Sequence, residues 1–383
     1  MWTDRNVCPT RDGENDPPTK ITRTKGSLFV PLRVGSWIGS GFFKQSTEQP
    51  KKVSCVTSSK VIKKDSMKIV IPGGSGQVGT ILARVFHKRG DDVVVLSRRP
   101  TDVPWRQTEW DGETLGDWVS ELEGAEAVIN LAGQSVNCRY TTENRRVLID
   151  SRVNSTRVVG QAIAQSQNPP RIWLQASTAT LYAHRYDAAN DEATGIIGGS
   201  EPNAPETWRF SIDIVTKWER EVNEAITPRT RKVLMRSAIV MSPDAGGPFD
   251  MLLRLVRFGL GGRAGDGKQF ISWIHDQDFT RAVQWLIQHP ELEGPINLAA
   301  PNPLPNAEFM QTLRAAWGTS VGLPSMRWML ELGAFLLRSE TELILKSRRV
   351  IPGILLQSGF TFDFATWTEA ARELCARWRK HEF

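Results

Sequence analysis

The sequence predicts an α/β protein built on a doubly wound parallel sheet, with a smaller mixed region towards the C-terminus. Three observations support this fold class. A glycine-rich turn joins an apolar strand to an amphipathic helix at residues 68–90, strand-like runs then alternate with helical patterns as far as residue 242, and this regularity loosens beyond it. Strands that alternate with helices form parallel sheets, because each connection must cross back over the sheet.

The first strand, turn and helix are contained in residues 68–90, KIVIPGGSGQVGTILARVFHKRG. Residues 69–71 are apolar, and the apolar positions after the turn recur at helical spacing. Glycines suit a turn in which the backbone closely approaches a phosphate at the N-terminus of a helix. A purely structural turn is the alternative. The residues expected to bind a nucleotide here are Gly73, Gly76, Gln77, Val78 and Gly79.

The second apolar run, residues 92–97, follows at the distance that a βαβ unit requires. It ends at Ser97, Arg98 and Arg99, where the adenosine ribose of a dinucleotide would lie. Two guanidinium groups attract a 2′-phosphate, whereas an acidic residue would bind the 2′-hydroxyl and repel a phosphate. The arginine pair therefore favours NADP(H) over NAD(H), with a solvated basic pair as the alternative.

Further elements continue the alternation of strands and helices. A short strand is expected to end at Trp110. The helices are expected over residues 115–122, 142–165 and 207–226, and the remaining strands over 127–131, 171–177 and 232–242. We expect these elements to complete a parallel sheet with helices on both faces.

The positive charge of the chain is confined to an N-terminal arm, residues 1–66. The 383-residue chain has a net charge of +6, and the arm alone contains 12 Lys+Arg against 6 Asp+Glu. The neutral remainder gives no compositional case for nucleic acid. The arm lacks the order of a secretory signal, and its early acidic residues are untypical of a transit peptide. We expect it to be disordered, dispensable or upstream of a functional start at Met67.

We divide the rest of the chain into three parts, a cofactor-binding domain at residues 67–242, a substrate-side segment at 243–300 whose elements return to the main core, and a small C-terminal domain at 301–383. Scattered cysteines and histidines predict neither a disulfide framework nor a metal site. The apolar segment 328–337 is far shorter than the roughly 18 residues of a membrane span, so we expect a buried helix.

We expect a small-molecule partner and neither nucleic acid nor membrane, and the sequence is compatible with a homodimer. The expected location is the cytoplasm, or an organelle if the arm is a targeting segment.

Four segments together resemble the extended short-chain dehydrogenase/reductase superfamily. They are GGSGQVG at 73–79, NLAG at 130–133, ASTATLYA at 176–183 and SWIHDQDFTRA at 272–282. Other segments, RSAIVMSPDAGG among them, are similar to an atypical nucleoside-diphosphate-sugar epimerase-like subgroup that ends in a small domain of unassigned function. The likeness covers residues 67 to about 374. It implies a Rossmann-type fold that binds NADP(H), with Leu131, Ala132 and Gly133 lining the cofactor.

The resemblance also implies a catalytic hydroxyl after strand 171–177, from Ser177 or Thr178. A hydroxyl beside the nicotinamide can hydrogen-bond the oxygen whose charge changes during hydride transfer. The alternative is that both hydroxyls bond to backbone. Active members usually place Tyr-x-x-x-Lys on the next helix. Lys217 matches the lysine that holds the ribose, but Asp213 occupies the tyrosine position, so the usual acid/base is missing and an i,i+4 ion pair is expected instead.

Tyr182 and His184 are nearby in sequence and could replace the missing acid/base, although aromatic residues after such a strand usually pack. On the substrate side, Trp273 could stack on a flat or sugar-like group, with core packing as the alternative. The residues expected to line the substrate are Arg139, Arg236, Gln269, Trp273 and His275.

Two functions remain open. The first is an NADP(H)-dependent epimerase, dehydratase or reductase that acts on a sugar-like or small carbonyl or alcohol substrate by hydride transfer. The second is a non-catalytic NADP(H)-binding regulatory or scaffold module.

Overall fold

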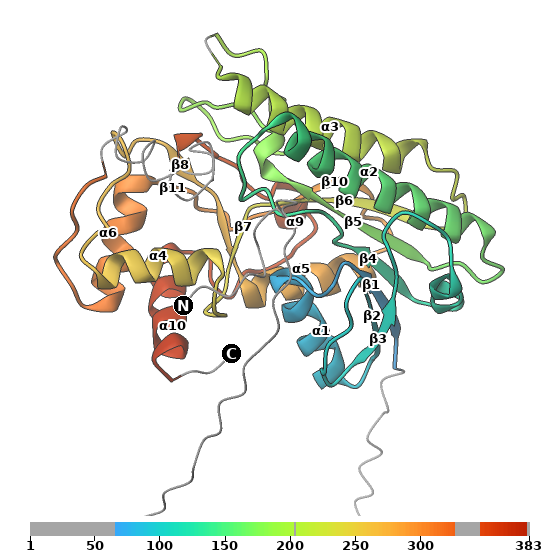
Figure 1. The fold of residues 1–383 in the computed structure, drawn as a ribbon. Coiled ribbons are helices and arrows are strands. Elements are labelled where there is room, and N and C mark those ends of the chain that lie inside the picture. Colours follow the sequence, from blue (N-terminus) through green and yellow to red (C-terminus); the bar gives the residue numbers. More distant parts are fainter. Residues whose placement is uncertain (1–65, 203, 326–344, 381–383) are drawn as a thin grey trace, which may run out of the picture. The chain divides into compact units, whose positions relative to one another are not determined.

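The computed structural model describes residues 66–202, 204–325 and 345–380. Its main feature is a seven-stranded sheet in the order β10-β6-β5-β4-β1-β2-β3, in which all neighbouring strands are parallel (Figure 1). Within these residues, none of the helices combines the length and the apolar character that a bilayer span needs.

The first strand in the chain is β1 (Lys68–Pro72), which lies between β4 and β2 in the sheet. The other strands are β2 (Asp92–Ser97), β3 (Arg106–Glu109), β4 (Ala127–Asn130), β5 (Ile172–Thr178), β6 (Arg231–Ser237) and β10 (Gly294–Leu298). Chain order runs from β1 to β3 on one side and from β4 outwards on the other, so the order reverses between β1 and β4. Ligands of doubly wound sheets bind at the carboxyl ends of the strands beside such a reversal.

Helices cover both faces of the sheet, as a doubly wound fold requires. One face carries α1 (Gln77–Arg89), α5 (Asp276–Gln288) and α9 (Gly353–Gln357), which share a buried apolar cluster with the strands. The other face carries α2 (Thr142–Gln165), α3 (Glu206–Glu224) and the 3-10 helix η1 (Asp117–Leu122). The predicted fold class is therefore confirmed.

The strand expected at 232–242 is two strands rather than one. β6 ends at Ser237, and β7 (Ile239–Met241) pairs in parallel with β9 (Trp273–His275) in a separate sheet. The neighbouring strands β5 and β10 end at the same point, because Ser237, the last residue of β6, pairs with their last residues, Thr178 and Leu298. Ala238 N makes the last bond to the main sheet, to Leu298 O (2.9 Å), and from Ile239 the chain pairs with β9 instead.

The C-terminal region encloses a third apolar cluster. It is built from α4 (Pro248–Arg257), α6 (Asn306–Trp317) and α10 (Trp367–Lys380), with β8 (Phe270–Ile271) and β11 (Leu304–Pro305) as a small antiparallel pair. The cluster combines residues 241–313 with residues 367–375, so a boundary at residue 300 runs through a shared core. Within residues 243–300, α5 packs on the main sheet and β10 forms one of its edge strands.

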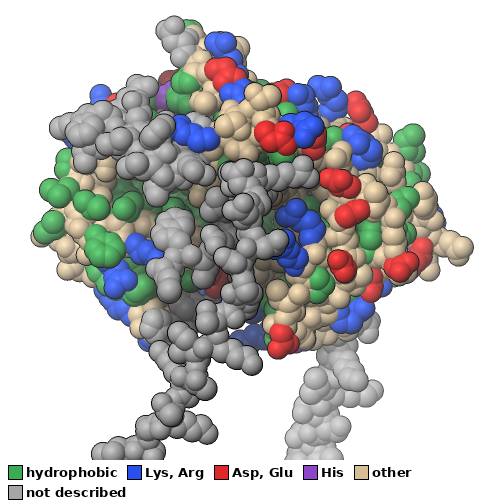
Figure 2. Space-filling view, viewed as in Figure 1, with side chains coloured by type: hydrophobic (Ala, Val, Ile, Leu, Met, Phe, Trp, Pro, Cys, Tyr) green, Lys and Arg blue, Asp and Glu red, His purple; other side chains and the backbone are tan. Residues whose placement is uncertain are grey.

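Two sequence predictions lie outside the described residues. These are the state of the arm, apart from its last residue, and the helix expected at 328–337. On the face of the molecule shown in Figure 2, acidic and basic side chains are interspersed over the region of α2 and α3, and they do not gather there into one basic patch.

Candidate active site at the carboxyl edge of the sheet

The glycine turn packs too tightly to accept side chains at its ends. Gly73 has φ +71°, and a Cβ on it would lie 2.5 Å from Ala132 Cα. A Cβ on Gly79 would overlap the backbone of Gly74. Gly76 is the N-cap of α1, and it provides no side-chain cap, while a Cβ there would meet nothing within 4 Å. The first N–H groups of α1 are thus left for a ligand, and their partial positive charge suits a phosphate.

The first residue of α1 carries a further sign of a ligand site. Gln77 Nε2 is buried and has no hydrogen-bond partner in the described part of the chain. It lies against Gly247, the N-cap of α4, where any side chain would collide with it. A buried amide without a partner is costly, and an acceptor such as a phosphate oxygen would satisfy it. The residues present therefore fit a phosphate-bearing nucleotide.

The end of β2 presents two exposed arginines. Ser97 is buried, and its hydroxyl donates to Arg99 O (3.1 Å) and accepts from Arg99 N (3.3 Å), which fixes the turn. Arg98 lines a cavity of about 460 Å³ at the ends of β2 and β3, together with Trp110 and Trp118. Acidic side chains from Glu109, Asp111 and Asp117 complete its wall. Because three carboxylates outnumber the single guanidinium in this lining, the cavity itself does not favour a phosphate, and the exposed Arg98 and Arg99 side chains are the groups available to one.

The segment after β4 is fixed against the glycine turn. Asn130 accepts a hydrogen bond from Ala132 N (3.1 Å) and donates to Gln175 Oε1 (3.0 Å), while Leu131 N donates to Pro72 O (2.9 Å). A Cβ on Gly133 would lie 3.2 Å from the Arg152 side chain. Residues 131–133 therefore follow β4 directly, at the carboxyl edge of the sheet beside the point where the strand order reverses.

Ser177 belongs to a buried polar network. Its hydroxyl donates to Glu219 Oε1 (2.6 Å), and Glu219 forms an ion pair with Arg236 (2.8 Å). Arg236 also donates to the Tyr182 hydroxyl (3.1 Å), which donates to Asn297 (2.9 Å). Burial raises the Tyr182 pKa more than Arg236 lowers it. The network holds Ser177 and Tyr182 in place and makes Arg236 a buried ion-pair partner rather than a wall of an open site.

Thr178 follows Ser177 on the strand, so its side chain points to the opposite face. It is half-buried, and its hydroxyl accepts from Thr180 N (3.2 Å) and donates to Thr180 Oγ1 (3.1 Å). These bonds lie within the short turn that includes η2 (Ala179–Leu181). Of the two hydroxyls expected at this edge, Thr178 is the one outside the Glu219 network.

The helix that should carry the acid/base has an ion pair instead. Lys217 Nζ lies 2.7 Å from Asp213 Oδ2, and the two side chains are 42% and 46% exposed. This confirms the expected i,i+4 pair. His184 packs against Trp208, and its Nδ1 accepts from Ser347 N (2.7 Å). Burial lowers the His184 pKa.

Three of the five residues expected to line the substrate lie in the core. Trp273 is fully buried in the third cluster and packs on Trp367. Gln269 is 2% exposed and donates to Ala264 O (3.0 Å). His275 is fully buried. These three residues and the buried Arg236 therefore do not belong to an open substrate site. Arg139 alone keeps a partly exposed side chain.

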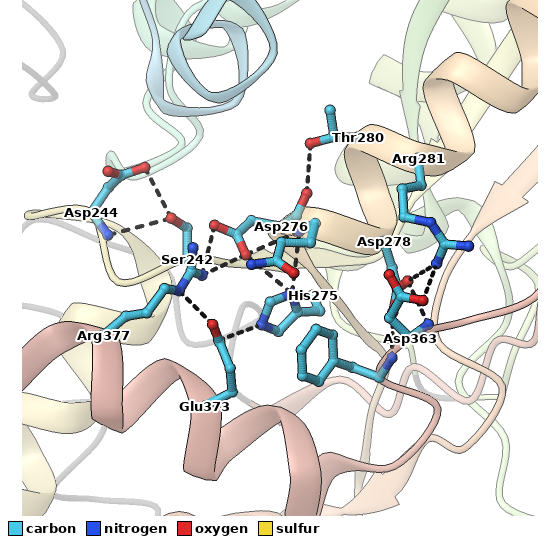
Figure 3. A network of polar contacts seen from close by, with 12 residues as sticks. Ser242, Asp244, His275, Asp276, Asp278, Thr280, Arg281, Asp363, Glu373 and Arg377 are labelled. Atoms are coloured by element: carbon cyan, nitrogen blue, oxygen red, sulfur yellow. Dashed lines mark hydrogen bonds and ion pairs between the residues drawn. The ribbon is translucent and has the colours of Figure 1, made fainter. Parts of the chain in front are cut away.

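His275 joins α5 to α10 (Figure 3). Gln277 N donates to His275 Nδ1, so the ring proton sits on Nε2, which lies 2.8 Å from Glu373 Oε2. Asp276 bonds to Arg377 (2.7 Å). Burial alone would raise the Glu373 pKa, but the hydrogen bond from His275 and the charge of Arg377 lower it below its ordinary value. The motif at 272–282 therefore attaches the C-terminal helix.

Sequence reasoning missed Glu219, Lys346 and Arg348. Glu219 shares a helical face with the buried residues Val215 and Val222, and this spacing would have predicted a buried carboxylate. Lys346 and Arg348 lie in the run KSRR, whose composition indicates an exposed segment, although both side chains are buried.

Comparisons with known proteins agree with this architecture. A model of the NAD dependent epimerase/dehydratase family matches residues 69–299, and a model of a domain of unknown function (DUF1731) matches residues 327–374. Human epimerase family protein SDR39U1 is 31% identical over 313 residues, which cover 81% of this chain and 100% of the human protein. Epimerase family protein YfhF of Bacillus subtilis is 28% identical over 317 residues, covering 81% and 98% of the two chains.

Solved structures show the same likeness. A crystal structure of human SDR39U1 (isoform 2) with NADPH matches with a TM-score of 0.71 at 28% identity, covering 81% of this chain and 99% of that chain. A nucleoside-diphosphate sugar epimerase from Corynebacterium glutamicum matches with a TM-score of 0.61 at 25% identity, covering 81% and 59%. With its seven-stranded Rossmann-type sheet and glycine turn, the chain belongs to the NAD dependent epimerase/dehydratase family.

Proposed function

We propose that the protein is an NADP(H)-dependent epimerase, dehydratase or reductase that acts on a sugar-like or small carbonyl or alcohol substrate. The observation that carries the proposal is the open N-terminus of α1, where Gln77 Nε2 lacks a partner among the residues that the structure describes. It lies on the same sheet edge as the exposed pair Arg98 and Arg99. The crystal structure of human SDR39U1 with NADPH supports the choice of cofactor.

Bound NADPH would donate a hydride to a substrate carbon, and bound NADP⁺ would accept one. The backbone of residues 73–79 would hold the diphosphate, and Arg98 with Arg99 would hold the 2′-phosphate. Lys217 would hold the nicotinamide ribose. Because Thr178 donates its own proton to Thr180 Oγ1, its remaining lone pair would accept a hydrogen bond from a water that in turn donates to the substrate oxygen. Because Asp213 stands in the tyrosine position and pairs with Lys217, we assign proton exchange to water at Thr178.

The deciding experiment compares the binding affinities of the protein for NADPH and NADH. The double variant Arg98→Ala, Arg99→Ala removes two charge-assisted contacts to a 2′-phosphate, each worth about 1.5–3 kcal/mol, so NADPH affinity should fall roughly 10²-fold or more. NADH affinity should change less than about threefold, since NADH lacks that phosphate. Arg146→Ala is the control, because Arg146 is exposed on α2 and forms an ion pair with the equally exposed Glu143. Equal losses for NADPH and NADH would contradict the assignment.

A non-catalytic NADP(H)-binding module is the second function, and the Asp213–Lys217 pair favours it. NADPH turnover with a panel of small aldehydes, ketones and sugars separates the two. A catalytic protein would lose turnover in Thr178→Ala while keeping its NADPH affinity. A module would bind NADPH selectively and turn over none of the panel.

A further inference from the structure

Two buried basic side chains from the C-terminal region reach the turn that carries Thr178. Lys346 is 1% exposed, and its Nζ donates to Thr180 O (2.7 Å). Arg348 is 9% exposed, and its Nε donates to Thr180 Oγ1 (3.2 Å). Thr180 Oγ1 also accepts the proton of Thr178 at 3.1 Å. Hydrogen bonds therefore run from Arg348 through Thr180 to the hydroxyl that we place beside the substrate.

The segment 346–348 is fixed on both of its sides. Towards the turn, Ser347 N donates to His184 Nδ1 (2.7 Å). Away from it, Arg348 N donates to Phe270 O (2.8 Å), and Ser272 Oγ donates to Arg348 O (2.6 Å). Val350 then enters a buried cluster with Ala179 and Tyr182. These contacts hold the backbone from which Lys346 and Arg348 extend.

The contacts bear directly on the direction of the Thr178 hydroxyl. A threonine side chain has three staggered rotamers, and the hydroxyl proton rotates to suit its acceptors. Arg348 is a permanently protonated, planar donor, so it occupies one acceptor site of Thr180 at any ordinary pH. Thr180 then offers its remaining acceptor site to Thr178, while its own N–H donates back to Thr178 Oγ1 (3.2 Å). The two bonds together favour one Thr178 rotamer.

We propose that Arg348, supported by Lys346, is a positioning residue that fixes Thr178 for reaction. The C-terminal region thereby completes the active-site edge of a sheet to which its described residues contribute no strand. This inference rests on the function proposed above, since the direction of Thr178 matters to catalysis only if Thr178 holds the water that exchanges a proton with the substrate.

Hydrogen exchange at the Thr180 amide, followed by NMR in the full chain, tests the proposal. Arg348→Ala should speed this exchange at least about tenfold, because a hydrogen bond from a charged donor is lost from the turn. Arg348→Lys should recover part of the protection. Arg349→Ala is the matched control, since Arg349 bonds to Tyr186 O (2.7 Å) and packs on Phe270 instead. NADPH affinity should stay within about threefold in all three variants.

The catalytic readout uses the carbonyl panel with NADPH. In Arg348→Ala, kcat should fall towards that of Thr178→Ala while KM for NADPH is unchanged, and Arg348→Lys should restore part of kcat. Unchanged Thr180 exchange in Arg348→Ala would overturn the proposal, as would faster exchange with wild-type kcat. Failure of the wild-type chain to bind NADPH would instead overturn the proposed function, and the exchange result would still decide whether Arg348 fixes Thr178.

Discussion

Removing the Glu219 carboxylate should be among the most destabilising single changes in the chain. The Glu219 and Arg236 side chains are 10% and 11% exposed, and they make two hydrogen bonds of 2.9 and 2.8 Å. Burial alone would lower the Arg236 pKa, but the hydrogen bonds and charge of Glu219 raise it above its ordinary value. Glu219→Ala leaves a buried guanidinium without its carboxylate, and breaking such a pair costs about 3–5 kcal/mol.

Glu221→Ala provides the matched control. Glu221 lies two residues further along α3 and pairs with Arg157 at 2.9 Å, but the Arg157 side chain is 49% exposed. An exposed pair of this kind contributes below about 1 kcal/mol. The two variants share the same chemical change on the same helix, so differences in helix propensity cancel.

Denaturant unfolding of the two variants measures the difference. We expect the unfolding midpoint of Glu219→Ala to fall far below that of Glu221→Ala at similar m-values. Replacing the pair with Glu219→Leu and Arg236→Met should recover much of the loss, because no buried charge is left unpaired. Equal destabilisation by Glu219→Ala and Glu221→Ala would refute the reasoning.

Two further predictions concern the turn and the C-terminal helix. Gly73→Ala should destabilise the protein more than Gly90→Ala. Both positions have positive φ, which alone costs an alanine about 1–2 kcal/mol, but only at position 73 would the new Cβ also collide with Ala132. Thermal unfolding compares the two, and similar losses would contradict the collision. Glu373→Gln should cost about 1.5–3 kcal/mol at pH 7, the value of a hydrogen bond to a charged group. The pKa of Glu373 is lower in the folded state than in the unfolded chain. The extra unfolding free energy of the wild type over Glu373→Gln is therefore fully present above about pH 5 and is lost as the pH falls through the folded-state pKa. A difference independent of pH between 7 and 3 would show that the carboxylate charge plays no part.

The fold was predictable where the determining residues are consecutive. The unit at residues 68–90 carries its strand, turn and helix signals in one stretch, and the structure places β1 and α1 there. The break at Ala238 was not predicted, because the apolar residues resume directly after Arg236 and Ser237 and two polar residues within a run do not by themselves end a strand. Its position depends on where β5 and β10 end, and these strands lie far away in the chain.

The site was predictable to the same extent. The glycine turn and the segment 131–133 are recognised locally, but Trp273 is buried by Trp367, which lies 94 residues later. Polar residue types at 269 and 275 suggested a substrate wall, and only the packing of α6 and α10 shows that they are internal. The homodimer and the cytoplasmic location stay predictions.

The order of strands in the sheet has a consequence for synthesis on the ribosome. β1, β2 and β3 add to one side in turn, and β4, β5, β6 and β10 then add to the other, so each new strand meets an edge that has already emerged. The cofactor side of the molecule can thus assemble while later residues are still being made. The Thr180 carbonyl and hydroxyl gain Lys346 and Arg348 as donors only once residues 346–348 have been released, which makes the active-site edge one of the final parts to be finished.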